Sequence, residues 1–282
     1  MGCKKKTRVS NLVIVSDLHC GCQLGLCPAE GIVLDEAGGY EPSPLQKIVW
    51  ACWREFWDVW VPEATRGEPF AVLVNGDSLD GRHHGSVTQI SQNLAVQSNI
   101  AKAVLKPIKD LCDGRLYMTR GTEAHVGASA EAEEQLAVDL KAVPDEYGRR
   151  SRYELWGVVG KGLVHASHHI GITGSSHYES SAVMKELSEL YAEAGRWRNR
   201  PPDVVVRSHR HRHLEVRVPT SLGYGISFTT AGWQLKTPFV YKIPGGRITM
   251  PQIGGSLIRQ GDEDLFTRHR TWTIPRPKVE IL

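Results

Sequence analysis

The feature that most constrains this chain is a series of short, β-branched apolar runs that end in acidic or histidine side chains. The first run covers residues 12–15 and is followed by Asp17 and His19. An apolar run of this length is typical of a buried strand in an α/β sheet. Two residues apart on an extended backbone, Asp17 and His19 point the same way and could bind one ion. One such pair also occurs by chance, so its meaning depends on the other strand ends.

Four further runs show the same pattern. Residues 70–74 lead to Asp77, residues 115–119 to the turn 120–125, residues 163–167 to His168, and residues 203–206 to His209 and His211. Open α/β sheets place their chemistry just beyond the carboxyl ends of their strands. A single histidine after a strand is more often a core or surface residue than a ligand. Five such ends in series are difficult to explain in that way and predict one shared site.

The segments between these runs predict the elements that surround the sheet. Helical spacing of apolar residues predicts helices over residues 44–60, 86–108 and 129–140, and a fourth that is capped by Ser175 or Ser176 and stopped by Pro201 and Pro202. Residues 20–43 are predicted to form a long loop, residues 153–167 a hairpin, and residues 215–282 a β-rich region.

The first predicted helix carries four tryptophans at helical spacing, namely Trp50, Trp53, Trp57 and Trp60. Packing of this stripe onto the sheet is the favoured interpretation. A dimer contact or a base-stacking platform is the alternative.

Composition limits the class of protein. With 282 residues and 41% hydrophobic content the chain can bury a large core, and one domain over residues 1–282 is expected. The net charge of +3 is too small to indicate nucleic-acid binding by itself. No apolar run reaches membrane-spanning length and no signal-peptide core is present, which predicts a cytoplasmic protein without membrane contact. The 6 cysteines are expected to be free thiols, with zinc binding by Cys20, Cys22 and Cys27 as the alternative.

The order of these strand ends resembles the calcineurin-like metallophosphoesterase superfamily over residues 9–215. Its signature runs Asp-x-His, Gly-Asp-x-x-Asp, Gly-Asn-His-Glu or Asp, a strand-end His, and Gly-His-x-His. Asp17 and His19 match the first motif, residues 76–80 match the second, and residues 209–211 match the last, with Ser208 where glycine is usual. His168 best matches the strand-end histidine, and His165 and His169 are its rivals.

The third motif departs from the family pattern. Gly121 is present, but Thr122 stands where the family has a metal-binding asparagine, and Glu123 where it has the histidine that assists the leaving group. A threonine hydroxyl is a poorer ligand, so the second metal is expected to be weaker or completed by Glu123. His125, two residues further on, could supply the missing catalytic imidazole.

The resemblance implies an α/β fold in which two mixed sheets pack face to face with helices outside. It also implies two divalent metal ions, with manganese as the first expectation and iron or zinc as alternatives. Asp17, His19 and His211 would hold the first ion, His168 and His209 the second, and Asp77 would bridge both. Hydroxide activated by the ions would then hydrolyse a phosphodiester or a phosphomonoester. Asp80 is expected to orient a ligand.

The substrate is less constrained than the chemistry. Several residues are candidates to contact or attract substrate phosphate, namely Arg82, His83, His84, Arg207, Arg210 and Arg212. They favour a nucleotide or nucleic acid as the partner, whereas the oligomeric state is left open. Two alternatives follow from the altered third motif: a non-catalytic binding or scaffold protein that kept the fold, and a hydrolase with one metal.

Overall fold

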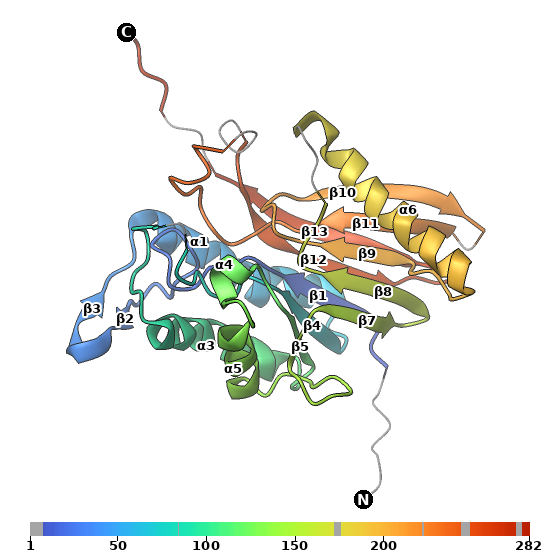
Figure 1. The fold of residues 1–282 in the computed structure, drawn as a ribbon, viewed down its shortest axis with the longest axis horizontal. Coiled ribbons are helices and arrows are strands. Elements are labelled where there is room, and N and C mark those ends of the chain that lie inside the picture. The colour runs from blue at the N-terminus through green and yellow to red at the C-terminus, as the bar shows by residue number, and fades with distance from the viewer. Residues whose placement is uncertain (1–7, 84, 172–175, 222, 244–248, 275–277) are drawn as a thin grey trace, which may run out of the picture.

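The computed structural model describes residues 8–83, 85–171, 176–221, 223–243, 249–274 and 278–282. Two large mixed sheets dominate it (Figure 1). In spatial order the first sheet contains β13 (Leu265–Thr273), β12 (Gln252–Gln260), β1 (Asn11–Val15), β4 (Phe70–Asn75), β5 (Leu116–Thr119) and β6 (Ser151–Arg152). The second contains β10 (Leu214–Thr220), β11 (Gly223–Thr229), β9 (Val204–Arg207), β8 (Gly162–Ser167) and β7 (Glu154–Val159). The predicted α/β class is confirmed.

The central strands of each sheet are parallel, as the predicted site requires. In the first sheet β1, β4, β5 and β6 run in parallel, and in the second β8, β9 and β11 do. The expected loop after β1 contains the small hairpin of β2 (Ile32–Val33) and β3 (Gly39–Tyr40) and the short helix η1 (Asp35–Ala37). The C-terminal region is β-rich as predicted, and its strand β12 pairs with β1 in the middle of the first sheet.

Alternation along β1 separates two hydrophobic clusters. Val13 and Val15 belong to a cluster shared with the helices α1 (Pro44–Glu55), α3 (Leu94–Leu111) and α5 (Glu131–Asp139). Leu12 and Ile14 point the other way, into a cluster that includes residues of the second sheet. This is the period of two that a strand buried on both faces requires. A fourth long helix, α6 (Glu179–Trp197), contacts β10 and β11 (Figure 1).

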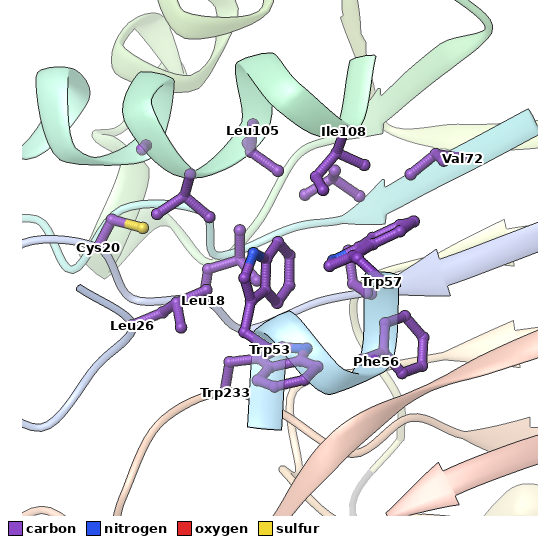
Figure 2. Packing of buried hydrophobic residues seen from close by; sticks show 14 of the residues in the cluster. Leu18, Cys20, Leu26, Trp53, Phe56, Trp57, Val72, Leu105, Ile108 and Trp233 are labelled. Atoms are coloured by element: carbon purple, nitrogen blue, oxygen red, sulfur yellow. The ribbon is translucent and has the colours of Figure 1, made fainter. Parts of the chain in front are cut away.

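The tryptophan stripe packs into the core beneath the first sheet. Trp53 and Trp57 are buried in the first cluster (Figure 2). Trp60 is buried in the same cluster, and Trp50 packs against it. The interpretation as core packing is confirmed, and the base-stacking alternative is wrong for Trp53, Trp57 and Trp60, because their buried rings contact other aromatic rings. The last turn of the predicted helix is η2 (Phe56–Trp60), a π-helical turn, and α2 (Val61–Thr65) continues the helix beyond its predicted end. The π turn buries Phe56 as well as Trp57 and Trp60.

Two predicted helix starts are wrong. The helix expected from residue 86 begins at Leu94, because residues 86–93 bind the loop after β1 instead of forming a helical turn. The N–H of Gln23 donates to the carbonyl of Thr88 at 2.8 Å, and the side chain of Asn93 caps the helix. The helix α6 starts at Glu179 after the short helix η3 (Ser176–Tyr178), and its N-cap is Tyr178. Ser175 lies outside the described residues.

The remaining predictions concern cysteines and membranes. The five described cysteines are free, as expected. Among the described residues, no metal-capable group contains a cysteine. Burial raises the pKa of Cys22 to about 11 and that of Cys27 to about 12, which keeps both thiols protonated. In the described parts of the chain, no helix combines the length and the apolar character needed to cross a membrane.

Candidate metal centre

The strand-end loops bring the six predicted metal ligands into two neighbouring groups. Within each group one ligand atom of every member lies within 4.8 Å of the others: Asp17, His19 and His211 form the first group, and Asp77, His168 and His209 the second. Five of these six residues have a left-handed backbone, with φ from 44° at His19 to 73° at His209. Such conformations cost about 1–3 kcal/mol each and are concentrated at functional sites.

Backbone hydrogen bonds hold the first two loops side by side. The N–H of Asp17 donates to the carbonyl of Gly76 at 3.0 Å, and the N–H of His19 to the carbonyl of Asp77 at 3.0 Å. Gly76 has a φ of +82°, and a Cβ at this position would lie 2.5 Å from Nδ1 of His168. A side chain at this position would displace the histidine, so the second motif requires glycine here for steric reasons.

The first group offers an open set of donor atoms. Nε2 of His211 lies 3.3 Å from Oδ1 of Asp17 and 3.2 Å from Nε2 of His19. Ser16 donates to Oδ2 of Asp17 at 2.5 Å, but the buried Oδ1 accepts no hydrogen bond from the described residues. Buried carboxylate oxygens usually have a partner. An open carboxylate oxygen beside two imidazole nitrogens fits a divalent cation such as manganese, iron or zinc.

The second group includes the hydroxyl group of Thr122. Oδ2 of Asp77 lies 3.0 Å from Nε2 of His168. Oγ1 of Thr122 donates to Oδ2 of Asp77 at 3.2 Å and lies 3.3 Å from Nε2 of His168 and 3.2 Å from Nδ1 of His209. The N–H of Thr122 also donates to Oδ1 of Asp77 at 2.7 Å. The threonine hydroxyl therefore lies among the donor atoms of this group.

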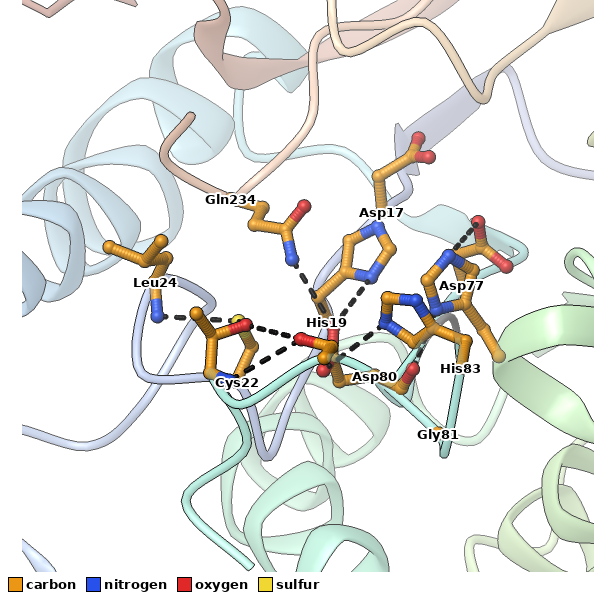
Figure 3. A network of polar contacts seen from close by, with 12 residues as sticks. Asp17, His19, Cys22, Leu24, Asp77, Asp80, Gly81, His83 and Gln234 are labelled. Atoms are coloured by element: carbon orange, nitrogen blue, oxygen red, sulfur yellow. Dashed lines mark hydrogen bonds and ion pairs between the residues drawn. The ribbon is translucent and has the colours of Figure 1, made fainter. Parts of the chain in front are cut away.

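Fixed acceptors orient two of the histidines. Nδ1–H of His168 donates to the last carbonyl of β4 at 2.8 Å, and Nδ1 of His19 lies 3.4 Å from Oδ1 of Asp80. In both rings Nε2 is thereby left for the metal-capable group. Asp80 is itself held by Gln89, which donates to Oδ2 at 2.9 Å, and by Gln234, which donates to Oδ1 at 3.3 Å (Figure 3).

The protonation states in the site depend on burial and on the close pair of Asp77 and His168. Burial alone would raise the pKa of Asp77, but the charge of His168 and its hydrogen bond hold that pKa well below 3.8. The same attraction outweighs burial at His168 and raises its pKa to about 10. Burial lowers the pKa of His125 and of His209 to about 4, so both are neutral at pH 7. A divalent cation would replace the His168 proton beside Asp77.

Glu123 and His125, the two other candidates on the turn that carries the third motif, lie in different surroundings. The helix α4 (Glu123–Val126) starts here, and the side chain of Glu123 is exposed. Glu123 belongs to none of the metal-capable groups in the described chain, so the structure does not bring it to the second group. Nδ1–H of His125 donates to the carbonyl of Asp80 at 2.6 Å, and its Nε2 lies 4.0 Å from Oδ2 of Asp77. His125 thus lies beside the candidate ligands, and it is itself a member of two metal-capable groups, one with His19 and Asp77 and one with Asp80 and His83.

The three candidates for the strand-end histidine have different surroundings. His168 lies against Asp77, as described above. His165 points to the other side of β8, where its Nε2 lies 2.8 Å from Oε2 of Glu154. His169 is exposed, its ring lies 5.1 Å from that of His168 and 5.8 Å from that of His209, and it belongs to none of the metal-capable groups in the described chain. The geometry therefore favours His168.

The expected phosphate contacts are only partly placed at the site. His83 belongs to a further metal-capable group, with Asp80 and His125. Arg82 is exposed and donates to a backbone carbonyl at 2.6 Å, and Arg210 donates to the carbonyl of Gly171. His84 lies outside the described residues.

The expectation that Arg207 attracts an anionic substrate is wrong. Its side chain is buried, and its Nε donates to Oε2 of Glu186 on α6 at 2.8 Å. Arg212 is likewise paired, with Glu179 at 2.9 Å. Both partners lie on a helix more than twenty residues away in the chain. The sequence around the last motif therefore gave no sign that these charges are neutralised.

Sequence reasoning missed the residues that hold the loops together. Glu133 of α5 is fully buried and accepts hydrogen bonds from the N–H groups of Ser78 at 2.9 Å and Gly121 at 2.7 Å. It thereby joins the loops that carry the second and third motifs. Asn75 donates to Oγ of Ser208 at 2.7 Å. Ser208 stands where glycine is usual in the last motif, and this hydrogen bond gives its hydroxyl a partner. Asn75 directly precedes the second motif and could have been suspected, whereas nothing in the sequence marks Glu133.

Comparisons with known proteins give only distant structural similarity. No family model matches the chain, and no curated protein matches it. Vacuolar protein sorting 29 from Cryptosporidium parvum is similar with a TM-score of 0.36 and 11% identity, covering 95% of this chain and 100% of that one. Protein TM1076 from Thermotoga maritima gives 0.38 and 9%, covering 94% and 100%. A double mutant of Vps29 from Entamoeba histolytica gives 0.37 and 9%, covering 93% and 99%.

Proposed function

We propose that this protein is a metal-dependent phosphoesterase with a dinuclear centre. The observation that carries the proposal is the convergence of two groups of buried carboxylate and imidazole donors on strained strand-end turns. Such donor sets at the carboxyl ends of parallel strands are typical of hydrolytic metal sites. Two bound divalent cations, with manganese as our first candidate, would lower the pKa of water and neutralise charge on the phosphate oxygens.

The residues present divide into two sets of ligands. We assign Asp17, His19 and His211 to one ion and His168 and His209 to the other, as their grouping suggests. The hydroxyl of Thr122 adds a donor to the second set, in place of the expected asparagine. Asp77 groups with His168 and His209 of the second set and also with His19 of the first set. It would therefore bridge the ions.

We assign proton transfer to His125. Because its Nδ1–H is held by the carbonyl of Asp80, its Nε2 carries the free lone pair. Burial lowers the pKa of this ring to about 4, which keeps Nε2 unprotonated at neutral pH, and a proton that Nε2 takes from the attacking water would readily pass on to a leaving oxygen. The fold proposed for this activity is an α/β sandwich, which is supported by a hydrophobic cluster containing residues of both sheets.

The decisive experiment is hydrolysis of bis(p-nitrophenyl) phosphate and p-nitrophenyl phosphate after removal and return of metal. We expect chelated protein to be inactive and to regain turnover with manganese, zinc or magnesium. Asp77→Asn should lose at least about a hundredfold in turnover, because it removes a charge shared by both ions. Asp110→Asn is the matched control, since that carboxylate is exposed on α3. Full activity of Asp77→Asn, or no turnover with any metal in folded protein, would refute the assignment.

A non-catalytic binding protein is the second candidate function. It is favoured by the third motif, in which the family's asparagine and histidine are replaced by Thr122 and Glu123. Metal analysis after dialysis distinguishes the two cases when it is combined with the assay above. Protein that retains two ions but hydrolyses neither ester would support the binding protein.

A further inference from the structure

Three arginine–tyrosine pairs occur at the free edge of the first sheet. The guanidinium of Arg120 lies 4.4 Å from the ring centroid of Tyr153, that of Arg149 lies 5.2 Å from Tyr147, and that of Arg152 lies 5.4 Å from Tyr117. Such contacts occur roughly once per 70–80 residues in proteins, so three within one edge form a concentration. We call the arginines and the exposed tyrosines of this edge the Arg–Tyr edge; they are Arg120, Tyr147, Arg149, Arg150, Arg152 and Tyr153.

The Arg–Tyr edge begins beside the candidate metal centre. β6 is the last strand of the sheet and runs parallel to β5, with Arg152 opposite Thr119. Arg120 and Tyr153 therefore follow these strands at their carboxyl ends, where the donor residues lie. Arg120 is separated from Thr122 by a single residue. β6 contacts both β5 and α5.

The edge combines four arginines with exposed rings, and two carboxylates, Asp145 and Glu134, lie close to the arginines. Arg149 is paired with Asp145 at 3.0 Å. Arg120, Arg150 and Arg152 instead donate to backbone carbonyls and belong to none of the ion pairs found among the described residues. Tyr147 and Tyr153 are 75% and 67% exposed. A cationic surface with accessible rings is suited to a polyanion that also carries flat aromatic groups.

The geometry of the edge is fixed before any partner binds. The side chain of Asp145 accepts hydrogen bonds from the N–H groups of Tyr147 and Arg149, both at 2.9 Å. Glu134 of α5 accepts from the N–H groups of Arg150 at 2.9 Å and Ser151 at 2.7 Å. These carboxylates hold the backbone of the turn in place. Less conformational entropy is then lost when a ligand binds.

We propose that the Arg–Tyr edge binds single-stranded nucleic acid and leads it to the metal centre. This inference rests on the proposed function for its cleavage step, whereas the binding step stands by itself. Unpaired bases can stack on Tyr147 and Tyr153, and the guanidinium groups can contact the intervening phosphates. Stacking needs no particular base, so we expect weak sequence preference. A duplex offers no free base faces and should bind less tightly.

The test is fluorescence anisotropy of a labelled oligothymidylate of about 20 nucleotides in the presence of chelator, which prevents cleavage. We expect Tyr153→Ala and Tyr147→Ala each to weaken binding about 5- to 100-fold, the range for loss of one stacked base. Wild-type binding should weaken as salt rises. Trp197→Ala is the matched control, because Trp197 is 72% exposed but lies at the far end of α6, and it should bind like the wild type.

Three results would overturn the inference. They are unchanged affinity in both tyrosine variants, preference for a duplex of the same length, and displacement by heparin with no dependence on the tyrosines, which would mean attraction of any polyanion. With metal restored, Tyr153→Ala should lose more activity on the oligonucleotide than on bis(p-nitrophenyl) phosphate. If the chelated wild type binds the strand but no metal restores hydrolysis of any ester, the proposed function fails and the binding surface stands.

Discussion

Replacement of Thr122 by valine tests whether its hydroxyl completes the second metal site. Valine keeps the shape and the backbone N–H that donates to Asp77, and it removes only the hydroxyl. Thr122 precedes α4 with an extended backbone and no side-chain capping bond, so the helix loses nothing. A hydrogen bond to a charged group contributes about 1.5–3 kcal/mol. At about 1.4 kcal/mol per factor of ten, the second ion should bind about 10- to 100-fold more weakly.

Isothermal titration with manganese at neutral pH measures this change directly. We expect two binding events in the wild type, and in Thr122→Val a weakened second event with the first preserved. Thr122→Ser is the matched control, because it keeps the hydroxyl and should retain both events. Unchanged binding of two ions by Thr122→Val would show that the hydroxyl is not part of the site. The reasoning from its three short contacts would then be refuted.

Two further predictions concern stability. Trp53→Ala should lower the free energy of unfolding by about 3–5 kcal/mol in urea denaturation, because Trp53 is buried against Trp57 and Trp233; a loss below about 1 kcal/mol would contradict this packing. Burial alone would raise the pKa of Glu215, but hydrogen bonds from His269, Thr267 and Arg217 lower it to about 2 from 4.5. A lowered pKa stabilises the fold above pH 4.5, and this stability is lost as the pH falls toward 2. Glu215→Gln should therefore remove about 1–2 kcal/mol of that pH dependence, as urea midpoints across this range would show.

The local pattern of the sequence was enough to place most strands and most candidate ligands. β-branched runs such as residues 12–15 and 203–206 became β1 and β9, because β-branched side chains favour an extended backbone and an unbroken apolar run suits a strand that is buried on both faces. The spacing of Asp17 and His19, and of His209 and His211, placed each pair at one strand end. The tryptophan stripe was interpreted correctly for the same reason, since helical spacing is a local property.

The predictions that failed concern features that are decided by contacts between distant segments of the chain. Residues 86–93 carry a helical pattern but bond to the loop after β1, and that pairing prevailed over local propensity. Arg207 follows a motif and looks available in the sequence, but Glu186 neutralises it from α6.

By itself, then, the sequence determined which residues end the strands and which of them carry metal-type donors. Only the tertiary structure decided how the altered third motif is used. It placed the hydroxyl of Thr122 among the donors, left Glu123 in solvent and set His125 beside Asp77. It also assembled the Arg–Tyr edge, in which Arg120 meets Tyr153 from the neighbouring strand. The physical reason is that donor type and strand preference are local properties, whereas the distance between two side chains depends on how the whole chain packs.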